Sequence, residues 1–275
     1  MAQAILGGLI AQKIPAGDFC VVEPMPETRA AIATLGVKAV AILTTDLIDC
    51  EAIVLAVKPQ MMRMAISPLK GTLTSQVVIS IAAGVDTSSL ALWLGSDNAP
   101  YKNVVRTMPN TPALIRAGIT GLYAANDVGV EGRQIAESLL AAVGKTLWCV
   151  DESLLDAVTA VSGSGPAYVF YFIEALEEAA LELGFDSDAA RIFATQTFLG
   201  GAQLAASTSE PPGVLRARVT SKNGTTERAI ETFEAHALKR AFINGVKAAC
   251  IRSRELGREL GAASAGSIDV VKGSH

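Results

Sequence analysis

Through residues 1–150, short apolar runs alternate with segments in which apolar residues recur at helical spacing. The apolar runs predict strands at residues 19–23, 37–41, 52–57, 76–81, 103–107 and 145–150. Helical spacing predicts helices at 2–12, 26–35, 60–66, 90–94 and 131–142, with a short helix or turn at 46–50. The continuous run at 52–57 predicts a strand buried on both faces. This alternation is typical of a doubly wound parallel sheet.

Strand patterns end at Asp151, and the rest of the chain has helical spacing alone. Helices are predicted at 151–161, 166–183, 188–207 and 211–219, followed by two more that reach about Leu260. Thr87 or Ser88, and Ser187, are the predicted caps of their helices, and Gly184 fits the position after a helix end. We therefore predict a first domain at 1–150, an all-helical domain at 151–262, and a tail at 263–275 that ends in a vector-like remnant.

Composition favours a cytoplasmic homo-oligomer. The chain is 50% hydrophobic and 18% charged, which is more apolar than one subunit surface needs. The uncharged run at 192–209 contains several polar residues and predicts a buried helix rather than a membrane span. A net charge of −4 without a Lys/Arg stripe argues against nucleic acid and anionic membranes. Four cysteines without metal-type spacing and two histidines fit a reducing cytosol and no metal site.

Three loops that follow predicted strands indicate a nucleotide crevice. In open parallel sheets, ligands bind beyond the carboxyl ends of the strands. The loops are Val57-Lys58-Pro59, Ala82-Ala83-Gly84 and Met108-Pro109-Asn110-Thr111-Pro112, which offer small side chains, rigid prolines and backbone donors. The alternative is structural, because Lys58 could be a solvated surface lysine and Asn110 could stabilise a turn.

Two further positions bear on a dinucleotide. Glu23 ends the predicted second strand of such a fold. An acidic side chain at that position bonds the ribose hydroxyls and favours NAD, and Arg29 could offset the effect of Glu23. The sequence starts at Met1, already inside the first helix, without the strand and glycine loop that hold the pyrophosphate. We expect these to be supplied by about ten residues upstream, or cofactor binding by the printed chain to be impaired.

Residues 219–226 read as a turn that runs into a helix start. The first amides of a helix lack intrahelical partners and carry partial positive charge. A small carboxylate is therefore predicted on the N–H groups of Gly224, Thr225 and Thr226. The alternative is an ordinary helix start with no ligand.

Several motifs together resemble the pyrroline-5-carboxylate reductase family, from Met1 to about Leu260. They are residues 4–9 (AILGGL), 56–60 (AVKPQ), 80–84 (SIAAG), 108–112 (MPNTP), 162–168 (SGSGPAY) and 220–226 (TSKNGTT). The resemblance implies an N-terminal Rossmann domain, a helical domain that interlocks with that of a partner, often in a ring of dimers, and NADPH or NADH as cofactor, usually with NADPH preferred. The absent glycine loop and Glu23 depart from the family pattern.

The resemblance also assigns roles to residues. It implies reduction of 1-pyrroline-5-carboxylate to L-proline, the last step of proline synthesis, by hydride transfer to the C=N carbon. The substrate carboxylate would rest on the amides of Gly224, Thr225 and Thr226, with Ser221 nearby. Thr226 is the predicted catalytic residue, because its hydroxyl would face the imine nitrogen. Ser164 and its glycines could act at this site or simply begin a helix.

Two other functions remain open from the sequence. β-Hydroxyacid dehydrogenases share the two-domain plan but place a catalytic lysine on the corresponding helix, and residues 166–183 contain no lysine. A non-catalytic dinucleotide-binding scaffold would explain the absent glycine loop. It would have no need of the carboxylate site at 219–226.

Overall fold

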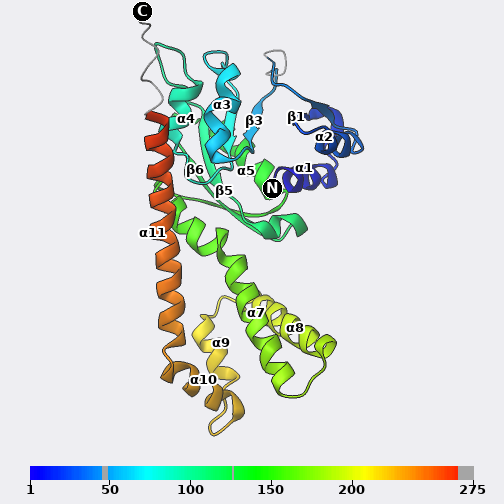
Figure 1. Ribbon diagram of the computed structural model, residues 1–275, viewed down its shortest axis with the longest axis vertical. Coiled ribbons are helices and arrows are strands. Elements are labelled where there is room, and N and C mark those ends of the chain that lie inside the picture. The colour runs from blue at the N-terminus through cyan, green and yellow to red at the C-terminus, as the bar shows by residue number, and fades with distance from the viewer. Residues whose placement is uncertain (45–48, 126, 266–275) are drawn as a thin grey trace, which may run out of the picture. The chain divides into compact units, whose positions relative to one another are not determined.

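The computed structural model describes residues 1–44, 49–125 and 127–265. The chain divides into two compact units (Figure 1). We call Met1–Gly163 with Cys250–His275 the sheet unit, and Ser164–Ala249 the helical unit. No helix in the described ranges is both long enough and apolar enough to cross a membrane.

The strands of the sheet unit form two sheets. A two-stranded parallel sheet pairs β1 (Cys20–Val22) with β2 (Lys38–Val40). A five-stranded sheet has the order β3-β4-β5-β6-β7. Its strands are β3 (Ala52–Leu55), β4 (Val77–Ser80), β5 (Val104–Met108), β6 (Gly118–Ala124) and β7 (Gly144–Trp148). Neighbours are parallel except β5 and β6, so the Rossmann-like fold is confirmed with one reversed strand.

The sequence patterns missed strand β6. Two of its seven residues are glycines, which weaken a strand signal because they have no side chain to pack. Tertiary contacts explain both. A Cβ on Gly121 would lie 2.8 Å from Val158 Cγ1, and one on Gly118 would lie 3.0 Å from the main chain of Ala113. The glycines therefore let other segments approach the sheet.

The prediction that residues 52–57 are buried on both faces is wrong. Val54 and Val57 are each 37% exposed, because β3 is an edge strand of the five-stranded sheet. The fully buried strand is β4, which lies between β3 and β5. An interior strand is covered on both faces and both edges, and an edge strand is not.

Helices pack on both faces of this sheet. Val77 and Ile79 of β4 join one core cluster with Ile5 and Leu9 of α1 (Ala2–Ala11) and with Ala136 and Leu140 of α5 (Val130–Ala141). Val78 of β4 joins another with α3 (Met62–Ile66) and α4 (Thr87–Leu94). Successive side chains of β4 therefore pack against helices on opposite faces of the sheet. The short α2 (Pro26–Ala33) packs against β2 through Ile32.

The predicted caps were each displaced towards the amino terminus. Asp86 caps α4 and accepts a hydrogen bond from Ser89 N at 2.6 Å, so neither Thr87 nor Ser88 is the cap. Asp186 caps α8 (Ser187–Ala206), so Ser187 is its first residue instead. Aspartate is as good a cap as serine, and the sequence offered both side by side. Gly184 has φ +97° directly after the C-cap of α7 (Gly165–Glu182), as predicted.

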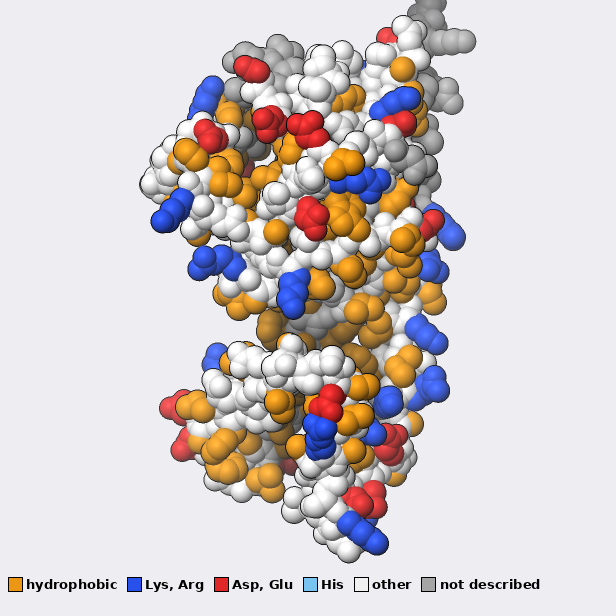
Figure 2. Space-filling view, turned by 180° about the vertical axis from the view of Figure 1, so that it is seen from behind, with side chains coloured by type: hydrophobic (Ala, Val, Ile, Leu, Met, Phe, Trp, Pro, Cys, Tyr) orange, Lys and Arg blue, Asp and Glu red, His pale blue; other side chains and the backbone are white. Residues whose placement is uncertain are grey.

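The helical unit contains α7, α8, α9 (Pro212–Arg218), α10 (Thr225–Ala235) and the start of α11 (Leu238–Ala265). Helices α7 and α8 pack along each other, and Phe242 of α11 contacts the rings of Tyr168 and Phe172 in α7. The prediction of a buried helix at 192–209 fails for the single chain. Ile192 is 62% exposed and Phe193 56%. Figure 2 shows hydrophobic side chains gathered on this unit.

The sheet unit extends past the predicted boundary at Asp151. Helix α6 (Leu154–Val158) and a π-helical turn at Thr159–Gly163 belong to it. The end of α11 returns to it, and Ser253 Oγ donates to Asp156 Oδ1 at 2.8 Å. The change of period in the sequence marks the end of the last strand. The boundary of the compact unit depends instead on where α6 packs. The predicted helix 46–50 and the tail 263–275 lie largely outside the described residues.

Candidate functional site

The three predicted cofactor loops lie at one edge of the sheet. They follow β3, β4 and β5, which are adjacent and parallel, so their carboxyl ends point the same way. Lys58 and Ala83 are exposed there, whereas Ala82 is buried. Gly84 has φ +77°, a conformation that a residue with a side chain adopts only with strain. Small side chains and a left-handed glycine leave the main chain accessible, which fits a flat nucleotide group.

Asn110 follows the carboxyl end of β5, and both polar atoms of its side chain form hydrogen bonds within the protein. It is 8% exposed. Its Oδ1 accepts a hydrogen bond from Ile119 N at 2.9 Å, and its Nδ2 donates to Ser162 O at 3.1 Å. Of its neighbours in the loop, Met108 is half-buried and Thr111 is exposed. Cofactor contact by Val57, Lys58, Pro59, Ala82, Ala83, Gly84, Met108, Asn110 and Thr111 stays a prediction.

Glu23 follows β1, and its main-chain N donates to Val40 O of β2. Its carboxylate accepts from Met25 N at 2.9 Å. Arg29 donates to the main-chain carbonyls of Glu23 and Pro24. The carboxylate lies directly after β1, at the position predicted to meet the ribose.

The predicted substrate loop forms a tight turn in the helical unit. Gly224 N donates to Ser221 O at 3.0 Å, and Asn223 has φ +61°. A Cβ on Gly224 would lie 2.5 Å from Ser221 Oγ, so only glycine fits this close approach. Because the Gly224 amide is used within the turn, it is less available to a carboxylate than the prediction assumed.

Helix α10 starts immediately after this turn. Its N-cap Gly224 provides no side-chain acceptor, and in the described part of the chain the amides of Thr225 and Thr226 have no hydrogen-bond acceptor. Glu227 reaches back to Asn223 N. Two open amides at a helix start form the anion-binding element that the sequence predicted. Binding by Ser221, Gly224, Thr225 and Thr226 stays a prediction.

Sequence reasoning missed a buried polar network in the sheet unit. Glu152 accepts hydrogen bonds from Thr87 N at 2.8 Å, from Thr87 Oγ1 at 2.7 Å and from Arg106 Nη1 at 3.0 Å. The Arg106 side chain is 9% exposed. An arginine inside an apolar strand needs a buried partner, and this was the signal that the sequence offered.

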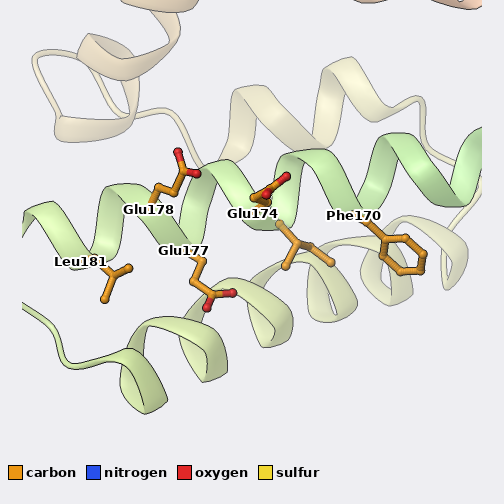
Figure 3. A pocket seen from close by; sticks show the side chains of 6 residues that line it. Phe170, Glu174, Glu177, Glu178 and Leu181 are labelled. Carbon is orange, nitrogen blue, oxygen red and sulfur yellow. The ribbon is translucent and has the colours of Figure 1, made fainter.

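No site forms at the hollow of about 540 Å³ along α7. Its polar lining consists of Glu174, Glu177 and Glu178. Figure 3 shows that these carboxylates point away from the helix in different directions rather than towards one point. Within the described ranges, no group of three or more His, Cys, Asp or Glu could hold a metal.

Comparisons with known proteins cover most of the chain. Residues 152–256 match the family model "Pyrroline-5-carboxylate reductase dimerisation", and residues 1–84 match "NADP oxidoreductase coenzyme F420-dependent". The chain is 44% identical over 265 residues to the pyrroline-5-carboxylate reductase of Pseudomonas aeruginosa, covering 95% of each chain. It is 34% identical to that of Arabidopsis thaliana, covering 93% of this chain and 92% of the plant protein.

Solved structures agree with these matches. The pyrroline-5-carboxylate reductase of Coxiella burnetii superposes with a TM-score of 0.86 at 38% identity, covering 93% of this chain and 94% of that one. The Plasmodium falciparum enzyme, solved with NADP bound, superposes with a TM-score of 0.79 at 25% identity, with the same coverage.

Proposed function

The chain belongs to the pyrroline-5-carboxylate reductase family, and we propose that it reduces 1-pyrroline-5-carboxylate to L-proline with NAD(P)H, the last step of proline biosynthesis. The observation that carries this proposal is the 44% identity over 95% of both chains to a reductase of that name. The open helix start at Thr225 and Thr226 supports it, because the substrate is a small carboxylate.

The cofactor supplies a hydride when it is bound. The residues that would hold it are the loops after β3, β4 and β5, with Glu23 at the end of β1. These small, main-chain-rich loops fit a nicotinamide dinucleotide. Glu23 favours a ribose with free hydroxyls, so the preference of the enzyme for NADPH or NADH depends on this residue.

The substrate makes modest demands on side chains. Its C=N carbon is already electrophilic, especially when the nitrogen is protonated, so positioning supplies much of the rate. The Thr225 and Thr226 amides orient the carboxylate, with Ser221 beside them. The Thr226 hydroxyl, directly or through a water, manages the proton on nitrogen. This mechanism is compatible with a chain that has only two histidines.

The role of Thr226 predicts a specific loss. Thr226→Val keeps the size and the main-chain amide but removes the hydroxyl, so kcat should fall about 10²-fold while the substrate KM changes little. Thr226→Ser, which retains a hydroxyl, should recover most of the rate. Steady-state kinetics with both variants is the measurement, and a normal turnover for Thr226→Val would show that the hydroxyl has no catalytic role.

The proposed reaction is tested by NADPH and NADH oxidation with pyrroline-5-carboxylate, with proline detected as product. The chain is assayed as printed and with an added N-terminal strand and glycine-rich turn. Substrate-dependent oxidation by either form supports the reductase. Folded protein that is inactive in both forms, yet binds the dinucleotide, would favour the scaffold.

Membership of the family makes the chain a homo-oligomer, because residues 152–256 match its dimerisation model. We propose an interlocked homodimer through the helical unit, with dimers assembled into a ring. The large exposed hydrophobic side chains of α7 and α8 support it. Four free cysteines are compatible with the cytosol as its compartment.

A further inference from the structure

One side chain joins the end of β5 to the π-helical turn at Thr159–Gly163. Asn110 accepts from Ile119 N at 2.9 Å, close to the start of β6, and donates to Ser162 O at 3.1 Å in the π-helical turn. It is 8% exposed, so water competes little for these bonds. Both ends of its amide are thus held by protein groups on different elements.

The Ser162 carbonyl needs this partner. In an α-helix it would accept from the N–H four residues later, but that residue is Pro166, which has no N–H. The next amide, Ala167 N, donates to Ser164 O instead. Ser162 is partly buried, where a carbonyl without a donor is costly, and the Asn110 amide supplies the donor that proline removed.

A second contact reinforces the same junction. A Cβ on Gly163 would lie 2.6 Å from Met108 Cε, so Met108 packs directly against the Gly163 main chain. Met108 and Asn110 therefore hold Ser162 and Gly163 from two positions of one loop. The chain enters the helical unit at the next residue, Ser164.

We propose that Asn110 is a positioning residue that locks the loop 108–112 to the turn at Ser162 and Gly163, and that its side chain does not bind the cofactor. The proposal rests on the proposed function, because the loop lies at the predicted cofactor edge. Hydride transfer needs the reacting atoms within about 3–3.5 Å of each other, so a loosened loop lowers kcat more than it weakens binding.

The test compares Asn110→Asp with Asn103→Asp. The Asn110 variant keeps the acceptor for Ile119 N but replaces the donor to Ser162 O by a second acceptor. Asn103 is a matched control, because it lies before the amino end of β5 and its Nδ2 donates to Ser75 O and Gln76 O. Asn110→Ala, which introduces no charge, is the second variant.

Three quantities are measured: amide hydrogen exchange of residues 159–164, kcat, and the NADPH Kd by fluorescence. For both Asn110 variants we expect exchange about tenfold faster and kcat lower by 10- to 100-fold, with the Kd within about twofold. Asn103→Asp should leave all three within about twofold of the parent.

Each of the following results would overturn the proposal. A tenfold weaker NADPH Kd with unchanged exchange would place the Asn110 side chain on the cofactor. Unchanged exchange or unchanged kcat in the Asn110 variants, or equal effects in Asn103→Asp, would remove the positioning role. Exchange and Kd do not depend on turnover, so with an inactive parent enzyme these two quantities would still decide the Asn110 interaction, while the inactivity would refute the reductase function.

Discussion

At the scale of single residues, Glu152 shows how one carboxylate can organise a buried site. It receives two hydrogen bonds from Thr87 and one from Arg106. Arg106 lies on β5, two residues before Met108, and Thr87 begins α4. The guanidinium is nearly buried, and a buried charge without a partner costs far more than the pair contributes.

Removing this carboxylate should therefore be expensive. Glu152→Ala is expected to lower the free energy of unfolding by about 3 kcal/mol, because Arg106 stays buried without its partner. Urea unfolding followed by circular dichroism measures it. Asp97→Ala is the control, since Asp97 and Lys70 form an exposed ion pair whose loss should be undetectable. Equal stability of the two variants would contradict the prediction.

At the scale of elements, the ends of helices were set by particular side chains. Asp86 begins α4 by accepting from Ser89 N. Burial tends to raise the pKa of Asp86, but hydrogen bonds from Ser89 and Ser88 and the charge of Arg106 outweigh it and lower the pKa below 3.8. Ionised Asp86 therefore stabilises the start of α4 more than protonated Asp86 does.

This shift has a defined pH dependence. A carboxyl whose pKa is lowered on folding stabilises the protein above its unfolded pKa, and this contribution is lost as pH falls from about 3.8 through the folded pKa. Asp86→Asn keeps a cap acceptor and should flatten the stability profile in that range. Asp86→Ala should cost about 1 kcal/mol at pH 7. Thermal unfolding between pH 2 and 7 measures both, and an unchanged acid limb in Asp86→Asn would contradict the assignment.

At the scale of the whole molecule, the two units differ in how they bury apolar side chains. The sheet unit has three clusters of buried hydrophobic residues, whereas in the helical unit only Ala190 and Ala194 are buried hydrophobics among the described residues. Such exposure of leucine, isoleucine and phenylalanine marks an association surface. We therefore expect the helical unit to be the part whose stability depends on a second copy.

A charge on this surface should dissociate the oligomer. Ile192 on α8 is 62% exposed, and Ile192→Asp is expected to shift the protein towards monomers because it buries an unpaired charge in the interface. Light scattering after size-exclusion chromatography measures the mass. Leu92→Asp on α4 is the control, since Leu92 is 67% exposed in the sheet unit. An oligomer that survives Ile192→Asp unchanged would place the interface elsewhere.

The sequence predicted all of the strands and helices that have a clear period, because burial on one face imposes that period directly. Six of the seven strands in the described ranges, the α7 end at Gly184 and the family were correctly anticipated. Strand β6 was missed, because its glycines are selected by the close approach of Val158 and Ala113. A pattern along the chain does not contain a tertiary contact such as that between Gly121 and Val158, which lie about 40 residues apart.

The sequence by itself determined the elements other than β6, the family and the candidate anion site at 219–226, since these depend on local spacing and short motifs. Only the tertiary structure decided which strands are interior, which residues cap the helices, and how individual side chains are used. Asn110 is the clearest example. Its sequence context fits a ligand contact or a turn, and only the folded chain places Ser162 O and Ile119 N against its amide. The physical reason is that hydrogen-bond partners distant in sequence are chosen by packing.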